Sequence, residues 1–407
     1  MKHKLTLCMI VKNEEANIKD TIENIVSNIG IDYWVISDTG STDNTINVIT
    51  ETFKNLNIEG EFQNREWKDF STNRNHVIEK AEPISEYLLF FDADDRIKGT
   101  LIVPELTDDV YFMRMESANV SFYRIFIVKT TFKWRYKGVL HEYIEMIPNV
   151  KKSTITGDYY IFDRQSGCRS KNPNKYLDDA LVFEKALISS ETPRSLIPRY
   201  CYYCAQSYKD AHMMDRAVDF YKKTLSENGW LQEKYVACKE LGRYYRDKDL
   251  KQSIKYYSLG VDLDPTRVEC VVELVSMYES DRLKFQLLTT VLPDKVADTS
   301  SDDYLFIEKL TTNVYFFNLV ILTGYNLGEE SIVCNYLIEQ LKRIDKIDEY
   351  YNKESVFSNT KLCLQQFSCA EVTRLFSTFE NIVNKNDDCR QFKKILDELD
   401  NKILDNQ

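Results

Sequence analysis

Residues 87–96, with the sequence YLLFFDADDR, restrict the fold of this chain more than any other stretch. The first five residues are all apolar and do not alternate with polar ones, which is typical of a short strand buried on both faces. The acidic run DADD begins at Asp92, where this strand must end. Three carboxylates in such a position repel one another unless a cation lies between them. The pattern fits either a solvated acidic turn or a site where Mg²⁺ or Mn²⁺ holds a phosphorylated ligand.

The size and composition of the chain favour a folded protein of two domains. It has 407 residues, of which 43% are hydrophobic and 29% charged, so it can bury a large core. The net charge of −11, without a long basic block, argues against nucleic acid as the main partner. No apolar run approaches the roughly 18 residues of a membrane-spanning helix, and the N-terminal one is too short for a signal peptide. We therefore expect a cytoplasmic protein with no membrane span.

The ten cysteines do not form a metal-binding pattern. Cys201 and Cys204 are spaced as C-x-x-C, but no second such pair and no nearby histidine accompanies them. Buried thiols in a reducing compartment are a better interpretation than a zinc site.

The N-terminal half alternates between strand-like and helix-like segments. We expect strands at residues 5–11, 33–37, 59–63 and 87–91. Helices are expected at residues 16–28, after residue 45 and at residues 71–81. This alternation with short connections predicts an α/β domain with a mainly parallel sheet.

Polar residues follow three of these strands. Asn13 and Glu14 come after the first strand, Asp38 after the second, and Asp92 and Asp94 after the fourth. Ligands of such sheets bind at the carboxyl ends of the strands. The convergence of these side chains at one edge favours a nucleotide-and-metal site over three independent solvated turns.

Two common nucleotide-binding motifs are missing from the sequence. Neither G-x-G-x-x-G after the first strand nor G-x-x-x-x-G-K-[ST] occurs, so a Rossmann dinucleotide site and a P-loop are not supported. The cations available for an anionic ligand in this half are Lys12 and Arg74. Arg74 taken alone would be interpreted as a surface helix residue.

Four segments, in this order and spacing, resemble family 2 glycosyltransferases. They are CMIVKNEEANI at 8–18, SDTGSTDNT at 37–45, RN at 74–75 and FFDADD at 90–95. The resemblance covers roughly residues 4–165 and implies the nucleotide-diphospho-sugar transferase fold called GT-A. It also implies roles for individual residues. Those bordering the nucleotide or its diphosphate would be Val11, Asn13, Glu14, Asp38 (on the base) and Arg74.

The same resemblance assigns the acidic turn. Asp92 and Asp94 would be the D-x-D motif that holds the ribose and a divalent metal, Mn²⁺ or Mg²⁺, while the role of Asp95 stays open.

A second candidate segment follows two expected antiparallel strands at residues 110–115 and 121–128. The sequence TFKWRYKGVLHE at 131–142 ends in His141 and Glu142. His141 alone could be an ordinary core or surface histidine. The segment resembles the W-x-G-x-x-H-E pattern of the same glycosyltransferases, although three residues, 135–137, separate Trp134 from Gly138 here. This resemblance implies that His141 completes the metal shell. Glu142 is then a candidate general base or an orienter of its neighbours, with Glu145 and Asp158 as rivals.

The C-terminal half is predicted to be helical, and we place the domain boundary between residues 167 and 168. Residues 201–208 align with 237–244, and 216–225 with 252–261, at an offset close to the roughly 34 residues of a tetratricopeptide unit. Further helices are expected at 176–189, 269–278, 305–322, 330–344 and 388–404. These helices either brace or dimerise the catalytic domain, giving a homodimer, or offer a concave surface to an acceptor.

Together these features predict a metal-dependent, inverting glycosyltransferase. The donor would be a nucleotide-diphospho-sugar, expected to be a UDP-sugar, and the acceptor a glycan or a protein. A sugar-phosphate nucleotidyltransferase would instead show a Gly-rich basic loop after the first strand. A non-catalytic tetratricopeptide adaptor with a degenerate transferase domain is the other alternative, and it would be favoured by loss of Asp92, Asp94 or His141. The residues themselves name neither the base, the sugar nor the acceptor.

Overall fold

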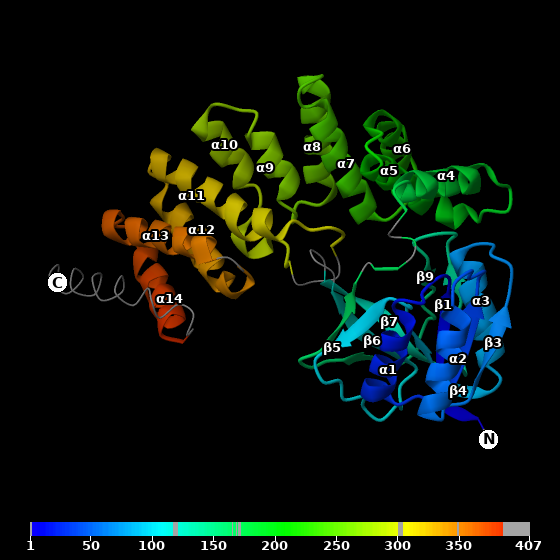
Figure 1. Ribbon diagram of the computed structural model, residues 1–407. Coiled ribbons are helices and arrows are strands. Elements are labelled where there is room, and N and C mark those ends of the chain that lie inside the picture. The colour runs from blue at the N-terminus through cyan, green and yellow to red at the C-terminus, as the bar shows by residue number, and fades with distance from the viewer. Residues whose placement is uncertain are drawn as a thin grey trace. The chain divides into compact units, whose positions relative to one another are not determined.

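The computed structural model describes residues 2–116, 121–164, 166–167, 169, 172–299, 304–347 and 350–385. The chain divides into two compact units, Met1–Phe220 and Tyr221–Gln407. The first unit contains the α/β domain and the helices that directly follow it, and the second is helical (Figure 1). An α/β domain followed by an all-helical region is the fold class that the sequence predicts, and it is confirmed.

The central sheet has nine strands among the described residues. Its parallel part has the order β3 (Gly60–Asn64), β2 (Tyr33–Asp38), β1 (His3–Val11) and β4 (Ser85–Phe90). The register pairs Val11 with Asp38, so the polar residues that follow β1 and β2 begin at one edge. The four strands expected from the sequence are all present, within a few residues of the predicted bounds.

An antiparallel extension continues the sheet beyond β4. The strand β7 (Ser121–Lys129) pairs antiparallel with β4 and with β6 (Val110–Glu116). Both β10 (Lys152–Ile155) and β11 (Tyr160–Asp163) run parallel to β6. The short β5 (Asp95–Lys98) closes the order by pairing with β11. A separate ribbon of β8 (Tyr136–Lys137) and β9 (Tyr143–Ile144) holds the segment that contains His141 and Glu142.

Helices cover both faces of the parallel strands. On one face, α1 (Ile18–Ile29) and α2 (Thr45–Leu56) bury their apolar sides against alternate residues of β1, such as Leu7 and Met9. On the other face, α3 (Phe70–Ala81) packs against Cys8 and Phe90. Because apolar residues of β4 contribute to both clusters, that strand is buried on both faces, as its unbroken apolar run predicts.

Two helices, α4 (Lys175–Ile188) and α5 (Ile197–Asp210), belong to the first unit. A short 3₁₀ turn, Arg194–Leu196, leads into α5. The hydroxyl of Tyr200 accepts a hydrogen bond from the backbone N–H of Val139, at 3.0 Å. The compact unit therefore extends to Phe220, past the boundary expected at residue 167, because α4 and α5 pack on the segment that precedes Glu142.

The helical repeat predicted from the sequence falls on corresponding helices. Residues 201–208 and 237–244 lie in α5 and in α7 (Leu231–Tyr245). Residues 216–225 and 252–261 lie in α6 (Met214–Ser226) and α8 (Leu250–Leu263). Glycines allow close packing here: a methyl group added at Gly242 would lie 2.5 Å from the ring of the buried Tyr257.

The remaining described helices of the second unit complete one apolar core. They are α9 (Glu269–Val275), α10 (Asp281–Leu288), α11 (Phe316–Leu327), α12 (Glu330–Lys342), α13 (Tyr350–Gln366) and α14 (Glu371–Lys385), with short helical turns at Pro293–Lys295, Thr311–Tyr315 and Ile344–Lys346. The helix expected at 388–404 lies outside the described residues. Within the described residues, no helix combines the length and the hydropathy required to cross a bilayer.

The helix expected over residues 305–322 begins later than predicted. The backbone carbonyls of Leu305 and Phe306 accept hydrogen bonds from Arg267, a fully buried arginine of this unit. Carbonyls turned toward a side chain cannot also accept the hydrogen bonds of a first helical turn. Helical structure therefore begins only at residue 309. A π-helical turn, Thr311–Tyr315, then leads directly into α11.

Candidate functional site

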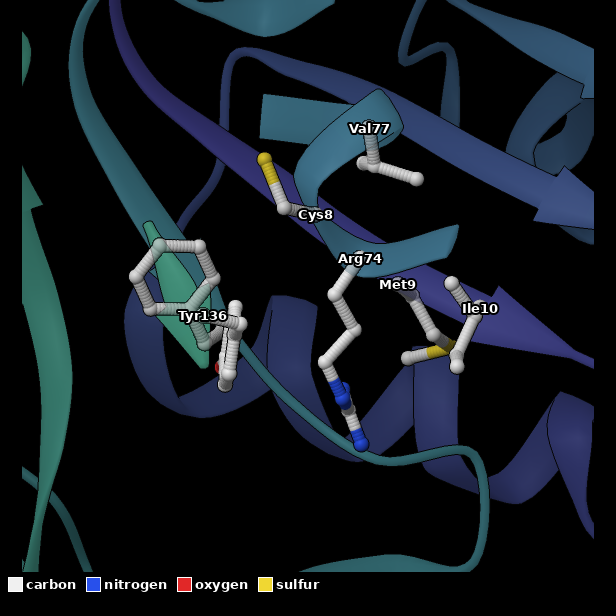
Figure 2. A pocket seen from close by; sticks show the side chains of 7 residues that line it. Cys8, Met9, Ile10, Arg74, Val77 and Tyr136 are labelled. Carbon is white, nitrogen blue, oxygen red and sulfur yellow. The ribbon is translucent and has the colours of Figure 1, made fainter. Parts of the chain in front are cut away.

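The N-terminal turns of α3 present Arg74 to the end of β4. The helix begins after Asp69, whose side chain accepts a hydrogen bond from the backbone N–H of Thr72, as an N-cap does. Figure 2 shows the Arg74 side chain leaving this helix beside Tyr136, with its guanidinium directed away from Cys8 and Val77. On the side that faces Cys8 and Val77, the space beside Arg74 is only a small void of about 10 Å³.

Two arginines hold the acidic turn together. Arg74 Nη2 lies 2.6 Å from Asp92 Oδ1, and Arg124 Nη1 lies 2.9 Å from Asp92 Oδ2. The second guanidinium also reaches Asp95, with Nη2 at 2.7 Å from Oδ2. Asp92 thus has one guanidinium on each oxygen, and the turn is not a set of solvated carboxylates.

Arg74 also joins the acidic turn to the second candidate segment. Its Nε donates to Glu142 Oε1 at 2.7 Å. Glu142 Oε2 has no hydrogen-bond partner among the described residues. The structure therefore links Asp92, Arg74 and Glu142, which lie far apart in the sequence, into one chain of contacts.

The pKa values of the residues in this network are shifted by burial and by the ion pairs between them. Burial opposes ionisation of Asp92, yet Arg74 and Arg124 hold its pKa below the ordinary value. Burial and the neighbouring carboxylates raise the pKa of Asp95, which is only 2% exposed. Although burial disfavours its charge, Arg74 keeps a pKa well above the usual value because of Asp92 and Glu142.

Asp94 stands apart from this network. Its Oδ2 accepts the backbone N–H of Gly167 at 2.8 Å, and among the described residues it makes no ion pair. Burial, and next the charge of Asp92, raise its pKa. A methyl group added at Gly167 would lie 2.8 Å from Asp94 Oδ2 and 3.1 Å from Glu14 Oε1. The carboxylates of Glu14 and Asp94 therefore both lie next to Gly167.

The loops after β1 and β2 bind each other. Val11 O accepts hydrogen bonds from the backbone N–H and the hydroxyl of Thr39, both at 3.0 Å. Asn13, in the left-handed region at φ 55°, accepts the N–H of Thr42 on its Oδ1 at 2.7 Å. The Asp38 carboxylate is buried and accepts N–H groups of its own loop, among them that of Gly40 at 3.1 Å. Val11, Asn13, Glu14 and Asp38 are thus brought together at the carboxyl edge, as the sequence predicts.

The ring of His141 packs against the helices that follow the α/β domain. Its centroid lies 4.3 Å from that of Tyr203 at an interplanar angle of 15°, and it also stacks on Phe183. Desolvation by these rings, and then Arg199, lower the pKa of His141, although part of the residue remains exposed to solvent. The structure therefore gives this histidine a packing role, and its predicted role as a metal ligand stays a prediction.

A cavity of about 510 Å³ opens beside the acidic turn. Arg74, Asp92, Arg124 and Glu142 line it, together with aromatic and aliphatic side chains from β7 and from the segment after Glu142. Neither of the rival bases does so: Glu145 pairs with Lys137 at 3.5 Å and is exposed, and Asp158 lies on the surface. Of the three candidate bases, Glu142 is the one that faces this cavity.

The side chains fit a divalent cation only in part. Among the described residues, no group of three or more His, Cys, Asp or Glu side chains is arranged to hold a metal ion. Sites that bind Mg²⁺ through one or two carboxylates and substrate phosphates do not need such a group. Asp94, with Glu14 near it, meets that smaller requirement.

The sequence does not mark Arg124 as part of the site. Its signal is weak but present, because it is the one charged residue inside the otherwise apolar or aromatic run FYRIFIV of β7. A cation at that position must find a carboxylate when the strand is buried, but the sequence does not say which one.

The α/β domain matches a known protein family. The family model "Glycosyl transferase family 2" matches residues 6–169, which confirms the resemblance seen in the sequence. No curated protein matches the chain.

Solved structures show distant likenesses. S. aureus TarS is 16% identical over 67% of this chain and 54% of its own, with a TM-score of 0.33. TarS 1–349, solved in complex with UDP-GlcNAc, is 14% identical over 80% of this chain and 92% of its own, with a TM-score of 0.32. The mannosyltransferase PcManGT from Pyrobaculum calidifontis, solved in complex with GDP-Man and Mn²⁺, is 12% identical over 69% of this chain and 89% of its own, with a TM-score of 0.31. The matched region spans about half of the full TarS chain.

Proposed function

We propose that this protein moves a sugar from a nucleotide-diphospho-sugar to an acceptor hydroxyl with inversion of configuration. The match of residues 6–169 to the glycosyl transferase family 2 model supports sugar transfer. The observation that carries the proposal is the chain of contacts from Asp92 through Arg74 to Glu142. It joins the first carboxylate of the D-x-D motif to a carboxylate that can serve as a base. Both carboxylates line one cavity.

The nucleotide is assigned to the carboxyl edge of β1 and β2. Val11, Asn13 and Glu14 would border it, and Asp38 would accept hydrogen bonds from its base. This assignment is supported by the register that pairs Val11 with Asp38. UDP is the nucleotide expected first, and the acceptor is a glycan or a protein.

A divalent cation, Mn²⁺ or Mg²⁺, would be held by Asp94 together with the donor phosphates, with Asp92 beside it. When bound, it would neutralise charge on the departing nucleoside diphosphate. Asp94 suits this role because it is partly buried and makes no ion pair among the described residues. A ligand role for His141 would require its imidazole to leave the stack on Tyr203.

Glu142 and Arg74 have different roles in the transfer. Glu142 Oε2 takes the proton of the acceptor hydroxyl, while the acceptor oxygen forms its bond to the anomeric carbon. The bond from that carbon to the phosphate oxygen breaks, and its electron pair leaves with the nucleoside diphosphate. Arg74 positions Glu142 by holding Oε1, and it orients Asp92 through the same guanidinium.

A donor screen tests this function. The full chain is incubated with Mn²⁺ and UDP-, GDP- or dTDP-sugars, UDP-GlcNAc and GDP-Man included, and released nucleoside diphosphate is measured. We expect release from at least one donor, abolished by EDTA and lowered about 100-fold or more in Asp94→Ala. The control is Asp20→Ala on the exposed side of α1, which should behave as wild type. The proposal is wrong if no donor yields nucleoside diphosphate, or if Asp94→Ala retains full activity.

A further inference from the structure

The cavity beside the acidic turn is rimmed by aromatic rings that remain in contact with solvent. Phe122 is 41% exposed, Tyr123 38% and Tyr143 40%, and all three line the cavity. Single exposed apolar residues are common, but a group of large rings around one opening marks a binding surface. The rings come from two separate segments, β7 and the start of β9.

Charged side chains that are less exposed than these rings line the same cavity. They are Asp92, Glu142, Arg74 and Arg124, and they lie beside buried apolar residues such as Phe90 and Ile144. A ligand that fits must therefore offer apolar faces to the rings and hydrogen-bonding groups to the charged side chains. A sugar ring has this combination, since its C–H groups carry partial positive charge that suits the negative face of an aromatic ring, while its hydroxyls donate and accept hydrogen bonds.

The ring of Tyr143 is held in place from α5. The Arg199 guanidinium carbon lies 5.0 Å from the Tyr143 ring centroid and 4.7 Å from that of Tyr203. Arg199 Nη2 also donates to the backbone carbonyl of His141 at 3.0 Å. Tyr143 is thus one member of a cation–π stack, and a ring fixed before binding loses little entropy when a ligand arrives.

The cavity adjoins the position assigned to the donor diphosphate but does not reach the position assigned to the base. Arg74 and Asp92 line it, whereas Val11, Asn13, Glu14 and Asp38 do not. Its volume of about 510 Å³ lies within the range of about 300–1,000 Å³ that is usual for small-molecule sites. It therefore has room for a second substrate next to Glu142.

We propose that the acceptor is a carbohydrate, bound in this cavity with sugar rings stacked on Tyr143 and on Phe122 or Tyr123, and with one hydroxyl directed at Glu142. Arg199 is a positioning residue that fixes the Tyr143 ring. This inference rests on the proposed function, because it identifies the cavity as the acceptor side of the same site. It chooses a glycan over a protein, the two acceptor classes that the sequence leaves open.

The test is a glycan-array experiment with the full chain, immobilised on beads so that weak binding becomes multivalent. We expect wild type to bind at least one array glycan, and Tyr143→Ala and Phe122→Ala each to lower that binding about tenfold. Tyr143→Phe keeps the ring and should stay within about threefold of wild type. Trp67→Ala, which removes an equally exposed ring (39%) that does not line the cavity, should bind as wild type. Thermal unfolding of each variant shows whether it is folded.

Two outcomes would overturn the proposal. One is that no glycan binds wild type better than a Tyr143→Ala, Phe122→Ala double variant. The other is that labelled sugar from the active donor is transferred to a peptide library but to no glycan. Glycan binding is read without donor, so its failure is distinguishable from a failure of donor release, which tests the proposed function separately.

Discussion

Arg124 connects two carboxylates of one acidic turn, Asp92 and Asp95. Asp95 is almost fully buried, and its guanidinium partner is the counter-charge that makes this burial tolerable. Breaking a buried ion pair from one side leaves an unpaired charge and costs about 3–5 kcal/mol. The same guanidinium holds Asp92, so loss of the Arg124 side chain also disturbs the donor site.

We expect Arg124→Gln to lower both the melting temperature and the donor turnover. The loss in free energy of unfolding should be about 3 kcal/mol, and nucleoside diphosphate release should fall at least about tenfold. A matched control is Arg114→Gln on the neighbouring strand β6, where the pair with Glu116 is about one-third exposed. Such a surface pair contributes about 0–1 kcal/mol. Equal melting temperatures and rates for the two variants would contradict the role given to Arg124.

At the level of single residues, the sequence allowed some of the site to be predicted. Asp92, Asp94 and Asp38 could be found because side chains that follow buried parallel strands gather at the edge of the sheet where ligands bind. Arg124 could not, because nothing along β7 shows which strand end its side chain faces. The inward turn of Asp38, which binds N–H groups of its own loop, depends on backbone geometry that composition does not encode.

At the level of elements, the segment from Gly138 to Glu142 depends on helices that follow it in the chain. Gly138 has φ +106°, a conformation that favours glycine, and His141 has φ 49°. Tyr200 holds the backbone at Val139, and Tyr203 stacks on His141. Helices α4 and α5 therefore help to place Glu142.

His141→Phe distinguishes packing from metal binding. Phenylalanine can keep the stack on Tyr203 but cannot bind a metal, so we expect Mn²⁺-dependent nucleoside diphosphate release within about threefold of wild type. His141→Ala should have both a lower melting temperature and a lower activity than wild type. If His141→Phe instead loses its response to Mn²⁺ while its melting temperature is unchanged, the imidazole is a metal ligand in the working enzyme.

The elements themselves were largely predictable, because unbroken apolar runs and helical stripes distinguish buried strands from amphipathic helices. The exception at residues 305–308 has a specific cause. The backbone carbonyls of Leu305 and Phe306 accept hydrogen bonds from Arg267, and a long-range contact of this kind overrides local helix propensity.

At the level of the whole molecule, the composition change near residue 168 is not where the first compact unit ends. That unit continues to Phe220, because α4 and α5 pack on the loop before Glu142. A boundary drawn from polar composition and Pro173 could not include these contacts, since they join residues about 60 positions apart in the sequence.

Shortened chains test this division. A chain ending at Gly229, after α6, should unfold in one cooperative transition. A chain ending at Gly167 lacks Tyr200 and Tyr203 and should melt at least about 5 °C lower, as measured by circular dichroism. Equal melting temperatures for the two chains would show that α4 and α5 do not stabilise the α/β domain.

Asp94 is the residue proposed to bind the divalent cation together with the donor phosphates. The most direct measurement is the electron paramagnetic resonance signal of free Mn²⁺, recorded with UDP and with GDP, in the presence of the wild-type chain or of Asp94→Ala. We expect the wild-type chain to lower the signal below that of Mn²⁺ and nucleotide alone for at least one nucleotide, and Asp94→Ala not to lower it. A wild-type chain that leaves the signal unchanged with both nucleotides, or an Asp94→Ala variant that lowers it equally, would contradict the metal-binding role of Asp94.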